Sequence, residues 1–310
     1  MVFLSGLLVP LVTENRLDEL EKYLKESIDD YSTSCCMEEA CKTANYEALD
    51  LMLRYGVNPT YPYLDSWKNA KEIGVLERLL PATIPFLDKV LEHSRQSALD
   101  IMLRKTVDLN AEKIIDSVLE LGGKFTHWDM FTALNNGNLD LVKKITEFVT
   151  IEKFVVSKAV GNKNIEALLF FESKGITLQN EELFNGSVSN SVELFELMLN
   201  RGNVVDEEII GKACYYPQIL AYLFHKDLFL KELQPKWLLK TIHDYQNQCV
   251  EEEIIDIFID NCEVNTTHGA ALFMLINSHN KEHAKKMIQK GEEVLPGHLF
   301  LAETLKMSLE

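Results

Sequence analysis

The chain has 310 residues, of which 31 are basic and 48 acidic, so its net charge is −17 at neutral pH. An excess of carboxylates repels phosphate backbones and anionic lipids, so the charge argues against binding to nucleic acid or to a membrane and favours a basic protein partner. Glycine (14) and proline (8) are scarce and no low-complexity linker interrupts the chain, which predicts continuous order. No apolar run approaches the roughly 18 residues of a membrane span.

The cysteines predict a reducing environment. None of them belongs to a C-x-x-C pair, and most fall inside helical patterns, as buried thiols do. They are Cys35, Cys36, Cys41, Cys214, Cys249 and Cys262. We therefore expect free thiols in a cytoplasmic protein, with no metal site and no cofactor.

The first elements in chain order are short helices. Residues 1–30 begin with an apolar stretch that lacks the basic leader of a signal peptide and runs into Asn15-Arg16-Leu17-Asp18, so they predict an N-terminal capping repeat. The next unit has a helix through Ala40, a turn at Ala44-Asn45-Tyr46 and a second helix through Leu53. It closes at Gly56, where a glycine can take the positive φ that follows a helix.

Residues 60–126 break this rhythm. A helix pair between Trp67 and Leu80 is expected to stop at Pro81 and Pro85, and Ser94-Arg95-Gln96-Ser97 is expected to replace the next turn. Residues 111–121 add a helix outside the period. Tyr61, Tyr63 and Trp67 form an aromatic cluster that fits either a binding edge or the filling of a distorted repeat.

Residues 127–294 are the regular part of the chain. Asp140, Glu166, Glu193 and Leu220 take the same place in successive units at intervals of 26 or 27 residues, and a fixed period of this size is typical of a solenoid. The full set of this position is Asp18, Glu47, Glu77, Asp140, Glu166, Glu193, Leu220, Glu253 and Glu282. Residues 244–252 lengthen one turn between paired helices, and residues 295–310 predict a C-terminal cap.

On these residues the units resemble degenerate ankyrin repeats. Ala40 matches the small residue between paired helices, Ala44-Asn45-Tyr46 the Gly-His-Leu turn, and Gly56-Val57-Asn58 the closing Gly-Ala-Asp. The opening Thr-Pro-Leu-His is missing and the period is shorter than the usual 33 or so, so the repeats lack most of their fingers. The resemblance implies an all-α, ankyrin-like helical-repeat solenoid of roughly nine or ten helix pairs over residues 1–310.

The resemblance also implies a function. Finger-poor arrays of this kind are similar to those of large DNA viruses and intracellular bacteria, which engage host regulatory proteins, so we expect a monomeric, non-enzymatic protein that binds another protein. In the family, residues at the end of the first helix line the concave face and touch the partner. The matching positions are Lys42, Thr43, Asn135, Asn136, Asn162, Ser189, Tyr215, Tyr216, Asn277 and Ser278. Tyr215 and Tyr216 are the best candidates for a hot spot, although a tyrosine packed under the next unit fits equally.

Two other functions fit short motifs. His279, Glu282 and His283 match the H-x-x-E-H pattern of zinc peptidases, but the repeat places His279 in a turn, which takes the two imidazoles off one helical face. Leu295-Pro296-Gly297-His298-Leu299-Phe300 resembles the start of an F-box, as in a ubiquitin-ligase substrate adaptor, but it also fits the first helix of a capping unit. No nucleophile elbow, phosphate-binding loop or kinase set is present.

Overall fold

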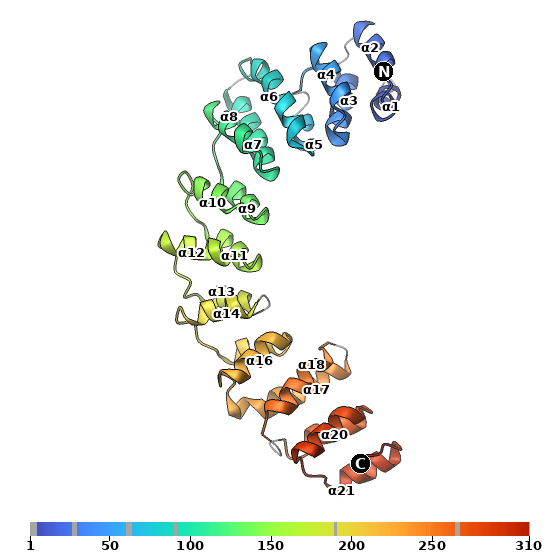
Figure 1. Ribbon diagram of the computed structural model, residues 1–310, viewed down its shortest axis with the longest axis vertical. Helices are drawn as coiled ribbons and strands as arrows, with labels where there is room; N and C mark the ends of the chain where they lie inside the picture. The colour runs from blue at the N-terminus through green and yellow to red at the C-terminus, as the bar shows by residue number, and fades with distance from the viewer. Residues whose placement is uncertain are drawn as a thin grey trace. The chain divides into compact units, whose positions relative to one another are not determined.

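The protein is all-helical. The computed structural model describes residues 5–26, 30–59, 64–89, 92–188, 191–247, 249–263 and 267–309. Within these ranges the chain forms 21 α-helices, one 3-10 helix and no β-strand, which confirms the all-α prediction (Figure 1). None of the helices in these ranges is both long and apolar enough to cross a membrane.

The helices divide into two compact units, Met1–Lys158 (unit 1) and Ala159–Glu310 (unit 2). The stacking of all pairs into a single solenoid over residues 1–310 stays a prediction. Unit 1 contains α1 (Ser5–Thr13), α2 (Leu17–Glu26), α3 (Asp30–Thr43), α4 (Tyr46–Arg54), α5 (Asp65–Asn69), α6 (Ile73–Leu87), α7 (Glu92–Asp108), α8 (Glu112–Glu120), α9 (His127–Asn135), α10 (Leu139–Ile145) and most of α11 (Lys153–Gly161).

Unit 2 continues the same series. It contains α12 (Ile165–Ser173), α13 (Glu181–Ser187), α14 (Val192–Leu199), α15 (Glu207–Ala213), α16 (Pro217–His225), the 3-10 helix Lys231–Leu233, α17 (Gln234–Gln246), α18 (Glu252–Asn261), α19 (Ala270–Asn277), α20 (Lys281–Lys290) and α21 (Pro296–Thr304).

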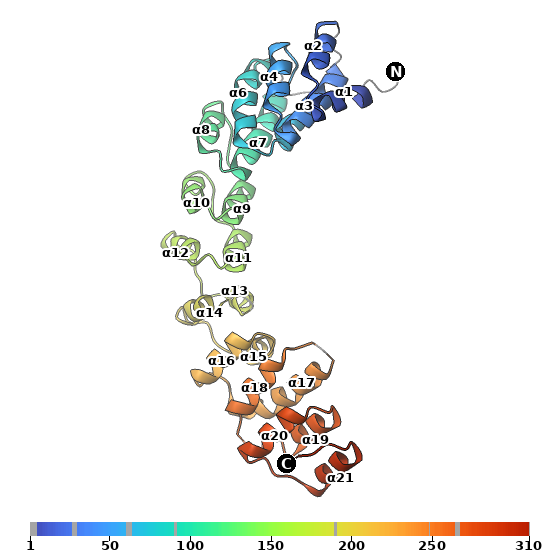
Figure 2. The same ribbon diagram turned by 45° about the vertical axis from the view of Figure 1, so that its right-hand side comes forward.

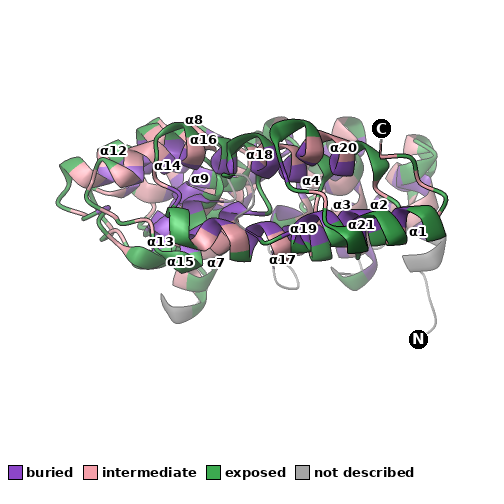
Figure 3. Ribbon diagram, turned by 90° about the horizontal axis from the view of Figure 1, so that it is seen from below, coloured by how far each residue is buried: buried purple, intermediate pink, exposed green. Residues whose placement is uncertain are grey.

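Each unit has two layers of helices. In unit 1 the first helices of the pairs, α1, α3, α5, α7 and α9, contact one another in that order, and the second helices α2, α4, α6 and α8 form the other layer (Figure 2). In unit 2, α17, α19 and α21 make one layer, and α14, α16, α18 and α20 the other. Buried residues lie where helices face each other (Figure 3), and Phe171, Phe195 and Phe258 are fully buried. Each helix therefore stabilises the fold through its apolar face.

The turn between paired helices recurs with the same geometry. The residue before its last position takes a positive φ at Ala44 (51°), Gly137 (69°), Lys163 (57°) and His279 (60°). An asparagine follows each of them and caps the second helix through its side-chain oxygen, which satisfies a backbone N–H that the helix leaves unpaired. The caps are Asn45 on Ala48 N (3.1 Å), Asn138 on Leu141 N (2.9 Å), Asn164 on Ala167 N (2.9 Å) and Asn280 on His283 N (3.3 Å).

Two of these asparagines also reach the preceding turn. The Asn45 amide nitrogen donates to Val12 O at 2.9 Å and to the Asn15 side-chain oxygen at 3.1 Å. The Asn138 amide nitrogen donates to the Asn110 side-chain oxygen at 3.2 Å. One side chain thus caps its own helix and ties it to the helix pair before it.

The predicted register is right for most second helices. Asp18, Glu47, Asp140, Glu166, Glu193, Glu253 and Glu282 are each the second residue of a second helix, where a carboxylate interacts favourably with the helix dipole. The prediction is wrong for Glu77, which is the fifth residue of α6, and for Leu220, which is buried in α16, where Gln218 takes the position.

The structure corrects the account of residues 60–126. Helix α6 continues through Pro81 and Pro85, because both residues are exposed and the carbonyls that they leave unpaired can face water. Residues 94–97 lie within α7 and form no turn, and the Gln96 amide donates to Asp100 at 2.8 Å along that helix. Helix α8 contacts α7, so residues 111–121 complete a pair instead of adding an extra helix. Tyr61 and Tyr63 lie outside the described residues.

Candidate protein-binding surface

The predicted partner-binding residues that the structure describes lie either at the end of a first helix or in the turn that follows it. Lys42 and Thr43 end α3, Asn135 ends α9 and Asn277 ends α19. Asn136, Asn162, Tyr215, Tyr216 and Ser278 lie in the turns that follow such helices. Ser189 lies outside the described residues.

Several of these side chains bond within the protein. The Asn136 amide donates to Val107 O (3.2 Å) and Asp108 O (2.9 Å), so it links α9 to the end of α7. Lys42 pairs with Glu38 at 2.5 Å, and the hydroxyls of Thr43 and Ser278 donate to backbone carbonyls of their own helices. These interactions stabilise the helix ends. Asn135 and Asn277 are exposed, as are Thr43, Asn136 and Asn162.

Tyr215 is held in a polar cluster of unit 2. Its hydroxyl donates to Asp244 Oδ2 (2.9 Å) and accepts from Lys240 Nζ (2.7 Å), while the ring lies 5.2 Å from the same ammonium group. Hydrogen bonds to Asp244 and Tyr215 raise the pKa of Lys240 to about 12. Burial alone would raise the pKa of Asp244, but the bonds from Lys240 and Tyr215 lower it. The residues Tyr215 and Tyr216 are 41% and 38% exposed, so a partner can reach them although the Tyr215 hydroxyl is occupied.

A second surface, which the sequence did not predict, lies on unit 1. Trp128 and Phe131 of α9 and Phe154 of α11 form a group of rings that we call the aromatic patch, in which Trp128 and Phe154 are exposed and Phe131 is half-buried. Its ring centroids are 5.8 Å apart for Trp128 and Phe131, 5.4 Å for Trp128 and Phe154, and 6.2 Å for Phe131 and Phe154. Trp128 is 59% exposed and Phe154 39%. The patch is continuous apolar area that water covers in the free protein.

The local sequence explains why Trp128 points outward. Thr126 precedes α9, and both its backbone N–H and its hydroxyl donate to Asp129 Oδ2 at 2.7 Å, so Asp129 turns inward. Asp129 is 3% exposed, and burial raises its pKa in spite of these bonds. Met130, Ala133 and Leu134 are also buried, which leaves the positions of Trp128, Phe131 and Asn135 together on the outer face of the helix.

Lys158 borders the aromatic patch. Its ammonium nitrogen lies 5.0 Å from the centre of the Phe131 ring, a cation–π distance. It forms no ion pair with any carboxylate in the described part of the chain. The patch therefore combines apolar rings with a positive charge at its edge.

The two histidines of the zinc-peptidase motif lie in different elements of the structure. His279 lies in the turn before α20, and His283 is buried within that helix. His283 Nδ1 lies 2.7 Å from the Asn280 side-chain oxygen, and its Nε2 lies 3.5 Å from Asp256 Oδ1 of α18. Among the described residues no group of three His, Cys, Asp or Glu side chains is arranged to hold a metal.

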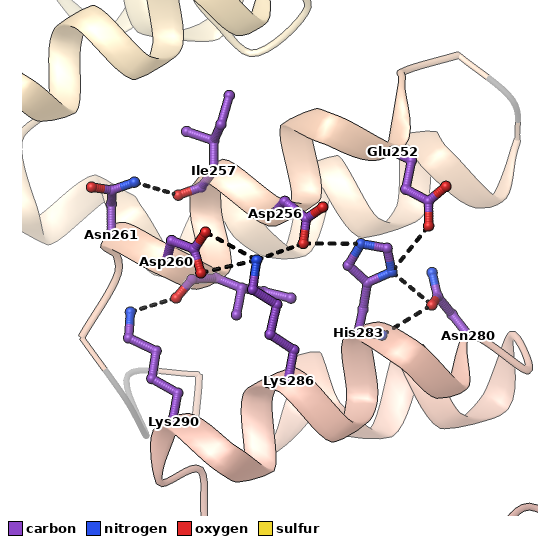
Figure 4. Close-up of polar contacts among 10 residues, drawn as sticks. Glu252, Asp256, Ile257, Asp260, Asn261, Asn280, His283, Lys286 and Lys290 are labelled. Carbon is purple, nitrogen blue, oxygen red and sulfur yellow. Dashed lines mark hydrogen bonds and ion pairs between the residues drawn. The ribbon is translucent and has the colours of Figure 1, made fainter.

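The neighbours of His283 show what this region does. Lys286 joins Asp256 (2.7 Å) and Asp260 (2.9 Å) (Figure 4). Lys290 donates to the carbonyl oxygens of Ile259 and Cys262 at the end of α18. A lysine near the last carbonyls of a helix also interacts favourably with its dipole. These contacts hold α20 against α18.

The F-box-like segment forms a helix that packs on unit 2. His298 is buried, and its Nδ1 accepts from Leu295 N at 3.0 Å. Its Nε2 then carries the proton and donates to Gly269 O at 3.1 Å, next to α19. Helix α21 contacts α19, as expected of a capping helix.

Comparison with known protein families gives no match to this chain, and comparison with curated proteins gives none either.

Proposed function

We propose that the chain is a non-enzymatic, ankyrin-like repeat protein whose partner protein docks on the exposed faces of the first helices of its pairs. The aromatic patch carries the proposal. Single exposed apolar side chains are common on protein surfaces. Three aromatic rings in mutual contact on two neighbouring helices are a different case, because they keep a continuous apolar area in water.

The chemistry of the patch suits recognition. Tryptophan is enriched among the few residues that dominate binding energy, and aromatic rings bury a large area for few rotatable bonds. Asn135 lies seven residues after Trp128, on the same face of α9, and the ammonium group of Lys158 lies on the Phe131 ring. Together they give the patch a polar rim of the kind that surrounds the apolar centre of an interface.

The ankyrin-like class and the cellular setting are part of the proposal. The recurrent turn, with its positive φ and capping asparagine, supports one repeated unit. All six cysteines are free thiols, which supports a reducing, cytoplasmic setting. The resemblance to viral and bacterial arrays favours a host regulatory protein as the partner.

Affinity capture with the whole protein tests the proposal, using Trp128→Ala and the control Phe148→Ala. Phe148 is 65% exposed but contacts Phe125 outside the patch, so the control removes an equally exposed ring elsewhere. Loss of a hot-spot tryptophan costs about 2 kcal/mol or more of binding free energy, which is roughly a 30-fold weaker complex. Both variants are expected to remain as stable as the wild type within about 0.5 kcal/mol, because the changed side chains are exposed.

The comparison of the two variants is decisive. The proposal requires a partner that the wild type and Phe148→Ala retain and that Trp128→Ala loses. Equal retention by both variants would remove the patch from recognition, and a partner lost instead on Tyr215→Ala would move the site to unit 2. Failure of the wild type to capture any protein would contradict the binding function itself.

A further inference from the structure

We infer that the partner segment that occupies the aromatic patch is acidic and carries a large apolar side chain as its anchor. The inference rests on the proposed binding function and adds the chemistry of the partner. It departs from the expectation, based on net charge alone, of a basic partner.

The charges beside the patch are the first reason. Lys158 lies on the Phe131 ring without an ion pair to any described carboxylate. Of the two carboxylates nearest in sequence, Asp129 is buried and accepts from Thr126, whereas Glu152 is exposed and lies 3.9 Å from the imidazole of His127. Lys158 is the cation that lies on the rings themselves, and a carboxylate of the partner can pair with it.

The distribution of charge along the chain is the second reason. The net charge of −17 comes from both ends: residues 1–50 carry 11 acidic and 4 basic side chains, and residues 159–310 carry 23 and 13. Residues 51–158, which include the patch, carry 14 of each and are neutral. At physiological salt the Debye length is about 8 Å, so the distant carboxylates are screened, and the charges at the contact determine which partner binds.

An acidic segment satisfies both features of the surface. Its apolar anchor covers Trp128 and Phe154, and a neighbouring carboxylate pairs with Lys158 at the edge of the interface. A basic segment gains a cation–π contact with the exposed face of Trp128 but brings a second cation next to Lys158. Like charges in contact oppose binding and select against the wrong partner.

Two synthetic peptides test the inference on the intact protein. They share the same tryptophan-free sequence of apolar residues and differ in one respect: every flanking charged residue is glutamate in one and lysine in the other. The readout is acrylamide quenching of tryptophan fluorescence. It reports mainly on Trp128, because Trp67 is fully buried, Trp237 is 9% exposed and Trp128 is 59% exposed.

We expect the glutamate peptide to protect Trp128 with a dissociation constant about tenfold lower than that of the lysine peptide. Lys158→Gln should weaken binding of the glutamate peptide about threefold, in keeping with the small energies of exposed ion pairs. Lys158→Glu should weaken binding of the glutamate peptide about tenfold and strengthen binding of the lysine peptide. Lys143→Glu is the matched control, because Lys143 pairs with Asp140 on α10, and it should leave both peptides unchanged.

Equal or tighter binding of the lysine peptide would overturn the inference, and so would an affinity for the glutamate peptide that does not respond to Lys158→Glu. Binding of neither peptide would also overturn it. These outcomes leave the proposed function in place if the captured partner still depends on Trp128. A captured partner whose binding is unchanged by Trp128→Ala refutes the proposed binding site, regardless of the peptide results.

Discussion

The turn between paired helices gives the sharpest test of the repeat, because a methyl group can be removed at one position and added at an equivalent one. Ala44 and Gly137 both precede the capping asparagine of such a turn in unit 1, with φ of 51° and 69°. We consider Ala44→Gly, which removes the methyl, and Gly137→Ala, which adds it. Neither change alters charge or the capping asparagine that follows.

The expected effects follow from the backbone. An L-residue in the left-handed conformation costs about 1 to 2 kcal/mol, whereas glycine loses about 0.5 to 1 kcal/mol more conformational entropy on folding. A Cβ at Gly137 would meet no atom within 4 Å, so no clash adds to the strain. Ala44→Gly should therefore raise the free energy of unfolding by about 0.5 to 1 kcal/mol, and Gly137→Ala should lower it by a similar amount.

Urea unfolding followed by tryptophan fluorescence measures both effects. Trp67 is a buried reporter in unit 1 and donates its indole N–H to the Thr83 hydroxyl at 3.0 Å. With a slope of about 2 kcal/mol per molar urea, the midpoint should shift by about 0.25 to 0.5 M, upward for Ala44→Gly and downward for Gly137→Ala. The double variant should return close to the wild type. A lower midpoint for Ala44→Gly would refute the view that positive φ determines the residue at this turn.

Two further predictions concern ionisable groups. Burial raises the pKa of Asp129 above its ordinary 3.8, so the folded state binds this proton more tightly than the unfolded chain, and the free energy of unfolding falls as pH rises through the interval above 3.8. Asp129→Asn keeps an oxygen acceptor for Thr126 and should stabilise the protein at pH 7, with a smaller gain in stability at pH 4. Urea midpoints at both pH values check this prediction, and a loss of stability at pH 7 would contradict it. Burial also raises the pKa of the Cys36, Cys41, Cys214 and Cys262 thiols to about 12, whereas Cys249 is exposed. A thiol reagent at pH 8 should therefore label Cys249 first and those four only on unfolding, and mass spectrometry of digested peptides would reveal any other order.

The sequence predicted the parts of the fold that depend on local chemistry. The turn that includes Ala44 and Asn45 has the predicted position, because an asparagine that caps a helix acts within three residues of itself. The acidic position was right for most second helices, because the spacing between successive units changes little. It failed at Leu220, because α16 begins at Pro217, so its second residue, Gln218, follows Glu193 by 25 residues instead of the 27 that the period predicts.

Residues 81–97 failed for a related reason. A proline ends a helix where the freed carbonyl has no other partner. Pro81 and Pro85 are exposed, so water can serve as that partner. The sequence alone does not show which side of the helix faces water. The polar residues 94–97 suggested a turn, yet they contain neither glycine, proline nor asparagine, and a helix surface accommodates them equally well.

The candidate site was harder to predict than the fold. Trp128 and Phe154 are 26 residues apart and are both the second residue of a first helix, so the period itself could have paired them. They were not singled out, because large aromatic residues usually signal a core. The binding of the Tyr215 hydroxyl could not be predicted, since Lys240 and Asp244 come from a later helix and only the packing of α17 brings them near.

The asparagines that join neighbouring turns constrain how this chain can evolve in length. Asn45 and Asn138 each need their own helix to cap and an earlier turn to receive their amide hydrogens. A duplication or deletion of one whole helix pair preserves both requirements where the neighbouring pairs carry the same asparagine turn. A gain or loss of part of a pair leaves an amide without its acceptor, so natural variants should differ in length by complete units.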